Sequence, residues 1–298
     1  MQSKFIFLFL LLYSTIFPFQ VKNIVGPISE KELIEPKFSP NNHYISATTP
    51  GYQRIIIFSF PELKVIDSFD YPGIGYNYKW SNDENNIICR EEKYKNKRKF
   101  YRISLIDIKS NSIIPLTDYQ RDISTPLIDG NNVVYYQSNN KKVINIQKKL
   151  DKTIPFNKQD CISYNGRIFL NSDFKIANQN QILLAPQIEH NGKFLVTKVA
   201  GGPLKIFFKN GNIKEIGDFV MPTISKDGKY IVMAQTKDDG HVYTESKLYI
   251  YDVTSSDIIP IDGLDNFIPV NPSISNDNRY IIFEDIKSSK VYFCELVK

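Results

Sequence analysis

Residue types that commonly build catalytic and metal centres are scarce in this sequence. Its 298 residues include only 3 histidines, 3 cysteines, 3 methionines and 1 tryptophan. The histidines are His43, His190 and His241, and no His or Cys pair has the spacing of a zinc site. We interpret His43 and His190 as turn residues and His241 as part of a solvated hairpin tip. The sequence therefore predicts no metal site and no bound cofactor.

Two catalytic motif classes are also absent. The chain has no Gly-x-Ser-x-Gly elbow, which an α/β-hydrolase would need for its nucleophile. It has no glycine-rich loop that could cradle a phosphate. Carboxylates are not clustered in the sequence in the way that metal-assisted catalysis favours. We predict a non-catalytic protein, and keep a propeller-type lyase or hydrolase as the weakest alternative.

The three cysteines, Cys89, Cys161 and Cys294, do not indicate a disulfide framework. Their number is odd, and Cys89 and Cys294 sit inside apolar stretches with a strand pattern. Buried free thiols are the predicted state of these two residues, because free cysteine behaves as a small apolar side chain.

The overall composition indicates a folded β protein. Hydrophobic residues make up 42% and charged residues 23%, which excludes a disordered chain. Ile, Val, Phe and Tyr dominate the apolar set, and these types fit a pleated, half-buried surface. The formal net charge of +5 is spread along the chain and forms no basic stripe. We therefore expect no nucleic-acid partner.

The first residues have the layout of an export signal. Lys4 is followed by an apolar run that Pro18 interrupts. About fifteen apolar residues at 1.5 Å each give roughly 22 Å as a helix, short of the ~30 Å hydrocarbon core. We predict a signal peptide or signal anchor at 1–20 and an exported protein that is periplasmic or envelope-associated, with secretion as the alternative. Membrane contact is expected only through this segment, if it stays uncleaved.

A repeated pattern organises the rest of the chain. Each copy has a Pro-x-apolar-Ser-x-Asp-Gly pattern or a degraded form of it, followed by an apolar strand. Ser, Asp, Asn and Gly in that order favour a tight turn, since Asx side chains bond their own turn backbone and Gly tolerates positive φ. The copies begin near Pro36, Tyr78, Pro126, Pro186, Pro222 and Pro272.

The spacing of the copies predicts a β-propeller. Six units over 21–298 average about 46 residues, within the roughly 40 to 50 residues of a four-stranded blade. We predict one all-β domain with six four-stranded blades, closed by a strand from 21–33 in the last blade. The hairpin pattern at 161–170 is assigned to the outer half of the third blade, and a degenerate seventh blade there is the alternative.

The string from Pro222 to Val232 resembles the repeat of TolB-type propellers, and the resemblance extends over essentially all of 21–298. The similarity implies a propeller fold and, by analogy, an envelope role in which the protein binds other proteins. In that family these residues build turns, so the motif assigns no catalytic or ligand-binding residue here.

Blade topology predicts where a partner would bind. Loops between the second and third strands of each blade emerge on the same face as the connectors between blades, and binding surfaces lie on loops held by rigid scaffolds. The loop 90–99 is basic, whereas the loop 236–245 carries acidic residues on the opposite side of a six-fold ring. The predicted partner-binding residues are Tyr76, Lys97, Arg98, Asp238 and Asp239.

We therefore predict a monomeric, exported propeller that acts as a scaffold for a protein or peptide partner. Carbohydrate or small-ligand binding in the central pore is the first alternative.

Overall fold

The computed structural model describes residues 18–129, 131–137, 140–146, 150–154, 162–164, 167–169, 183–189 and 191–297. Throughout these residues the regular structure is β-strand, apart from a short 3-10 turn at Pro50–Tyr52. The predicted all-β class is confirmed. The apolar N-terminal run, Cys161 and His190 lie outside the described residues.

Most strands form antiparallel four-stranded sheets in chain order. The first sheet is β2–β5 and the second is β6–β9, followed by β10–β13 and β16–β19. Their bounds are β2 Ile34–Phe38, β3 Tyr44–Thr48, β4 Arg54–Ser59, β5 Val65–Asp70, β6 Lys79–Trp80, β7 Asn86–Lys95, β8 Arg98–Asp107, β9 Ser112–Pro115, β10 Leu127–Asp129, β11 Asn132–Gln137, β12 Asn140–Asn145, β13 Leu150–Ile154, β16 Leu183–Ile188, β17 Phe194–Val199, β18 Leu204–Phe208 and β19 Ile213–Gly217.

The remaining strands form one eight-stranded and one two-stranded sheet. The larger has the order β20-β21-β22-β23-β1-β26-β25-β24, and the smaller pairs β14 with β15. Their bounds are β1 Phe19–Val25, β14 Ile162–Tyr164, β15 Arg167–Phe169, β20 Val220–Ile224, β21 Tyr230–Asp238, β22 Tyr243–Asp252, β23 Ile258–Asp262, β24 Pro269–Ile274, β25 Tyr280–Asp285 and β26 Lys290–Val297.

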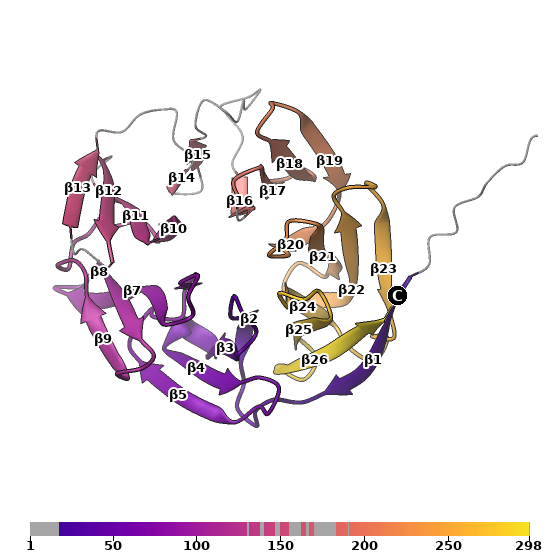
Figure 1. Cartoon of the computed structure of the whole chain (residues 1–298). Coiled ribbons are helices and arrows are strands. Elements are labelled where there is room, and N and C mark those ends of the chain that lie inside the picture. Colours follow the sequence, from indigo (N-terminus) through magenta and orange to yellow (C-terminus); the bar gives the residue numbers. More distant parts are fainter. Residues whose placement is uncertain are drawn as a thin grey trace, which may run out of the picture.

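The sheets are arranged around a common centre as in a propeller, with β2, β10, β16, β20 and β24 innermost (Figure 1). Separate apolar clusters fill the spaces between neighbouring sheets. One cluster joins the first and second sheets, another the second and third, and a third joins β17–β18 to β21–β22. The core is therefore divided into layers between sheets, which is why each strand carries a short apolar stretch.

The repeat builds the turn after the innermost strand in the copies that keep its serine. Ser225 is buried, its Oγ donates to Asp227 Oδ1 at 2.6 Å, and it accepts from the Tyr230 backbone N at 2.9 Å. Ser275 makes the same two bonds to Asp277 and Tyr280. One hydroxyl thus closes the turn and starts the next strand, which explains why Ser and Asp recur at this spacing.

The residue before four of the six copies of the repeat also has a special backbone conformation. Glu35, Asn77, Met221 and Asn271 have φ values of 47°, 52°, 53° and 47°. In β2, β20 and β24 the pairing with the next strand shifts register at this point, which is the mark of a β-bulge. A following proline supports the irregularity in these three strands, because proline cannot donate to the ladder.

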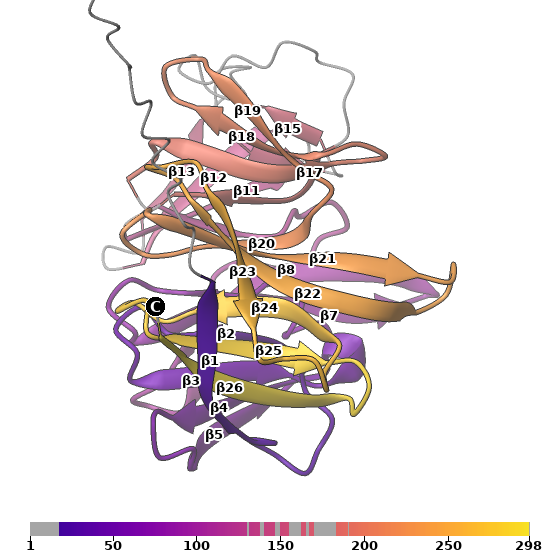
Figure 2. The same cartoon turned by 90° about the vertical axis from the view of Figure 1, so that its right-hand side faces the viewer.

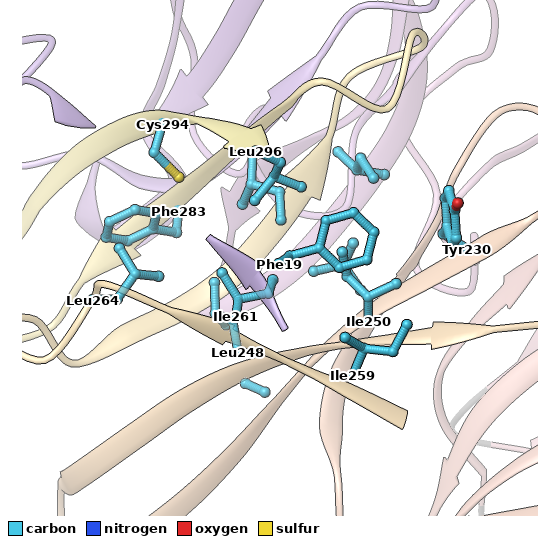
Figure 3. Close-up of a cluster of buried hydrophobic side chains, with 14 residues drawn as sticks. Phe19, Tyr230, Leu248, Ile250, Ile259, Ile261, Leu264, Phe283, Cys294 and Leu296 are labelled. Atoms are coloured by element: carbon cyan, nitrogen blue, oxygen red, sulfur yellow. The ribbon is translucent and has the colours of Figure 1, made fainter. Parts of the chain in front are cut away.

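The N-terminal strand closes the largest sheet. β1 pairs antiparallel with β26 and parallel with β23. Phe19 is buried among β22, β23 and β26 side chains, including Ile250, Ile261 and Leu296 (Figure 3). The predicted closing strand is confirmed in position, although it covers Phe19–Val25 and so begins within the range predicted as a signal.

Three predicted segments differ from the structure. The 161–170 pattern does form a hairpin, β14–β15, but β12 and β13 already supply the outer half of the third sheet, so the hairpin is a separate sheet. The range 90–99 is mostly strand, because β7 and β8 pair continuously as far as Lys95 and Arg98. The range 236–245 is likewise shortened by β21 and β22 to a turn at 239–242.

Cys89 and Cys294 are buried free thiols, as predicted. No helix within the described ranges is long and apolar enough to cross a membrane.

Candidate functional site

Two long hairpins extend from the same side of the ring. Figure 2 shows β7–β8 and β21–β22 both reaching beyond the other strands in one direction, and Figure 1 places them on opposite sides of the centre. We call this side the hairpin face; it carries the turn residues Asn96 and Lys97 of the first hairpin and 239–242 of the second. This arrangement agrees with the prediction that the segments 90–99 and 236–245 lie on one face of the ring.

Lys97 and Arg98 lie at the tip of the first hairpin, and both are exposed. Asn96 and Lys97 have φ values of 51° and 59°, so the two residues form a tight two-residue connection between β7 and β8. Their side chains are free to meet a partner, but the tip is remote from the aromatic residues at the hairpin base. In the described part of the chain, the ring of Tyr76 contacts Tyr52 and Arg90 and neither of these two tip residues.

Asp238 and Asp239 lie at the tip of the second hairpin, and their carboxylates accept hydrogen bonds from the backbone of the same turn. Asp238 Oδ1 accepts from the Gly240 N at 2.9 Å, and Asp239 Oδ1 accepts from His241 N at 2.9 Å and Val242 N at 3.0 Å. The bonds from Val242 and His241 lower the pKa of Asp239. These carboxylates therefore shape the turn, and both side chains are exposed.

Tyr76 belongs to an aromatic and basic cluster that the sequence did not predict. Its ring packs edge to face on Tyr52, with centroids 5.1 Å apart. The Arg90 guanidinium lies 5.7 Å from the Tyr76 ring and 4.1 Å from the Tyr101 ring, and Arg90 Nη1 donates to the Ile123 carbonyl at 3.1 Å. Tyr76 is 42% exposed, so this cluster presents an aromatic surface backed by a fixed cation.

A buried ion pair anchors the base of the same hairpin. Glu91 is fully buried, and its Oε2 lies 2.8 Å from Arg102 Nη2 and accepts from the Tyr119 hydroxyl at 2.9 Å. The Arg102 guanidinium also lies 4.6 Å from the Tyr119 ring. Burial and the bond to Glu91 raise the pKa of Tyr119 to about 12. The β7–β8 hairpin is therefore held rigidly where it leaves the ring.

A second group of charges lies on the innermost strands. Lys37 of β2 and Lys79 of β6 occupy the same position of the repeat in neighbouring sheets, and both are half-buried. Lys37 Nζ donates to the Tyr78 carbonyl at 3.0 Å and lies 4.0 Å from the Tyr78 ring. Burial, and next the charge of Lys79, lower the pKa of Lys37 to about 7. Burial lowers the pKa of Lys79 too.

Two carboxylates accompany these lysines. Glu35 Oε1 accepts from the Tyr52 hydroxyl at 2.9 Å. Glu284 Oε2 accepts from Asn271 Nδ2 at 2.9 Å and from the Glu35 backbone N at 3.3 Å. Burial raises the pKa of Glu284. Only the repeat position could have drawn attention to Lys37 and Lys79. Glu35 shares β2 with Lys37, whereas Glu284 belongs to β25, which is distant in sequence.

The described residues contain no group of three or more His, Cys, Asp or Glu side chains that could hold a metal ion. This finding covers the ranges that the structure describes and no others.

No family model matches the chain, and no curated protein matches its sequence. Solved structures do match. An oligogalacturonate lyase from Vibrio parahaemolyticus shares 11% identity at a TM-score of 0.52, covering 90% of this chain and 79% of the lyase. The Cps50 (Swd1) β-propeller domain of Myceliophteria thermophila shares 8% identity at a TM-score of 0.54, covering 94% of this chain and 100% of that domain.

A third match is KlHsv2 with loop 6CD replaced by a Gly-Ser linker, with 14% identity, a TM-score of 0.50, and 90% of this chain and 98% of that chain covered. At such identities the likeness extends to the fold and does not reach activity. The protein is an all-β chain whose four-stranded sheets are arranged as in a β-propeller.

Proposed function

We propose that this protein is a non-catalytic β-propeller that binds a protein or peptide partner on its hairpin face. The observation that carries the proposal is the position of Arg90 between the Tyr76 and Tyr101 rings, at the base of a hairpin that projects from the ring. Tyr and Arg are enriched among the residues that dominate protein interfaces. Their side chains are already held in place, so little conformational entropy is lost on binding.

The two hairpins give the face an uneven charge. The first hairpin carries Lys93, Lys95, Lys97, Arg98 and Lys99, of which Lys99 pairs with Glu92 at 2.9 Å. The second carries Asp238 and Asp239, while its Glu245 is paired with Lys237 at 2.7 Å. Complementary charges of this kind set orientation and association rate more than affinity. We expect the partner to place an acidic region over Lys97 and Arg98.

The test uses affinity capture from envelope extract with the folded protein as bait. The double charge reversal of Lys97 and Arg98 to Glu, and separately Tyr76→Ala, should each deplete the same captured protein several-fold. Lys64→Glu, an exposed change at the outer edge of the first sheet, should leave capture intact. Equal capture by the wild type and both hairpin-face variants would exclude this face as the binding surface.

The proposal includes the number of blades and the TolB-like class. The eight-stranded sheet divides at β1 into β20–β23 and β24–β26 plus β1, which would make six four-stranded blades. The β14–β15 pair lies between the third and fourth sheets, in the place of an incomplete seventh blade (Figure 1). The Ser-x-Asp turns support the TolB-like resemblance, because the Ser and Asp residues of the repeat form the tight turns that the motif predicts.

Export is proposed from the N-terminal segment alone. A reporter enzyme active only outside the cytoplasm, fused after the full chain, should be active, and deleting 2–17 should abolish its activity. N-terminal sequencing of the exported protein would then show whether the segment is removed. A reporter that stays inactive with the full chain would exclude export.

A further inference from the structure

We propose that Lys37 and Lys79 together bind a small oxyanion, a carboxylate or phosphate group, at the inner wall between the first and second sheets. This inference goes beyond partner binding at the hairpin face and does not depend on it. It rests on the arrangement of charged groups along the innermost strands.

The Lys79 ammonium group is the first part of the argument. Within the ranges that the structure describes, no hydrogen bond, ion pair or aromatic ring contacts its side-chain nitrogen. The side chain is nevertheless half-buried, and burial lowers the pKa of this lysine. A desolvated charge without a partner is costly, so an anion at this position would remove an unfavourable feature of the free protein.

Lys37 supplies the second cation. An ammonium group has three N–H donors, and Lys37 uses one on the Tyr78 carbonyl. This bond and the contact with the Tyr78 ring fix the nitrogen near the start of β6, the strand that carries Lys79. The two charges are close enough for Lys79 to lower the pKa of Lys37. An oxyanion shared by both would replace this repulsion by attraction.

The equivalent positions in other sheets show that the lysines are not needed to join the blades. In β20, Thr223 Oγ1 donates to the Pro272 carbonyl at 2.6 Å. In β24, Ser273 Oγ accepts from the Phe38 backbone N at 3.2 Å. Short hydroxyl side chains therefore suffice for bonds between neighbouring sheets. Lysine at 37 and 79 adds two charges to one sector of the inner wall.

The nearby carboxylates do not fill this role. Glu35 is bonded to the Tyr52 hydroxyl, and Glu284 is bonded to Asn271 and to the Glu35 backbone. Neither forms an ion pair with Lys37 or Lys79 in the described structure. Glu35 is near enough to raise the pKa of both lysines, so it offsets part of the lowering that burial causes. The groups left to bind a ligand are therefore the N–H donors of the two lysines. Such donors favour an anion over a cation.

The test is calorimetric titration of the full chain at low ionic strength with inorganic phosphate, with glucuronate and with glucose. Glucuronate and glucose differ in the carboxylate, so only the first should bind if the site reads the carboxylate group. Phosphate binding without glucuronate binding would assign the site to phosphate. Absence of binding by both anions would overturn the proposal.

Lys79→Met should weaken anion binding by about 10-fold or more, because a hydrogen bond to a charged group contributes about 1.5–3 kcal/mol. Lys79→Arg keeps the charge and should retain most of the affinity. Lys64→Met is the matched control, since Lys64 is exposed on the outer part of the first sheet. Unchanged affinity in Lys79→Met, with the fold verified by circular dichroism, would overturn the proposal independently of any result at the hairpin face.

Discussion

The Glu84 carboxylate lies 2.7 Å from His43 Nδ1, and this contact joins the turns of two neighbouring sheets. Glu84 also accepts from Ser39 Oγ at 2.5 Å and from the Asn41 backbone N. It occupies the repeat position that Gly228 fills in the best-conserved copy of the pattern within this chain, and it keeps a positive φ of 59°. A departure from the turn pattern therefore supplies a bond between blades.

Replacing Glu84 by Gln should destabilise the protein by about 1–3 kcal/mol, because a buried carboxylate that accepts several hydrogen bonds is lost. Urea denaturation followed by circular dichroism would measure the change. Glu62→Gln is the control, because Glu62 is exposed. Equal stability of the wild type and Glu84→Gln would show that the contact contributes nothing.

The Glu84 contribution should also depend on pH. Burial alone would raise the pKa of this carboxyl, but the bonds from Ser39, Asn41 and His43 outweigh it and lower the pKa overall. A lowered native pKa gives stability that is present above the unfolded value of about 4.3 and is lost as pH falls through the native value. The difference in unfolding free energy between wild type and Glu84→Gln should therefore shrink below about pH 4. A difference that stays constant from pH 7 to pH 3 would contradict this assignment.

Ser225→Ala should lower the free energy of unfolding by about 1–2 kcal/mol. The buried hydroxyl closes its turn through Asp227 and receives the Tyr230 backbone N, which Ala would leave unsatisfied. Ser68→Ala, at an exposed position of β5, should change the free energy little. Chemical denaturation would measure the free energy of unfolding of both variants. A similar decrease in the two would argue against the role of the repeat serine.

Phe19→Ala should destabilise the protein by about 3 kcal/mol or more, because it removes a buried aromatic side chain and leaves a cavity. The Phe19 ring packs edge to face on Tyr230, with centroids 6.0 Å apart. Ile24→Ala, also in β1 but at a position 39% exposed, is the matched control. Thermal unfolding would compare the stability of Phe19→Ala with that of Ile24→Ala. An equal decrease in both variants would mean that Phe19 does not hold β1 in place.

Lys79→Met should raise the unfolding free energy by about 1 kcal/mol in buffer without multivalent anions, because an unpaired, desolvated charge is removed. Differential scanning calorimetry would detect a higher Tm. Added phosphate should raise the Tm of the wild type more than that of Lys79→Met, because the variant binds the anion more weakly. A lower Tm for the variant would show that the ammonium group has a stabilising partner.

The arrangement of strands could be predicted because its determinants are local. Each Ser-x-Asp turn is specified within a few residues, and a run of such turns at blade spacing favours a ring. The reach of the β7–β8 hairpin could not be predicted in the same way. Arg90 and Glu91 support its strands through contacts with Ile123 and Tyr119, which lie in the connector between β9 and β10, and Glu91 also pairs with Arg102 on β8.

The candidate sites were predicted less completely. Tyr76, Lys97 and Arg98 were recognisable by residue type and by their place in connectors, but pairing Tyr76 with Arg90 requires the packing of two blade segments. Lys37 and Lys79 look like ordinary polar positions of two strands. Their proximity depends on how the first sheet is rotated against the second. The spacing of residues in the sequence carries no information about that rotation.

The double pairing of β1 sets an order on folding. Among the described strands β1 is made first, whereas its two neighbours, β23 and β26, are made late. Its native pairing must therefore wait until β23 and β26 have been made. A ribosome stalled before Ile258 would hold a nascent protein whose opening strand has neither neighbour, and such a chain would be an easy substrate for proteases.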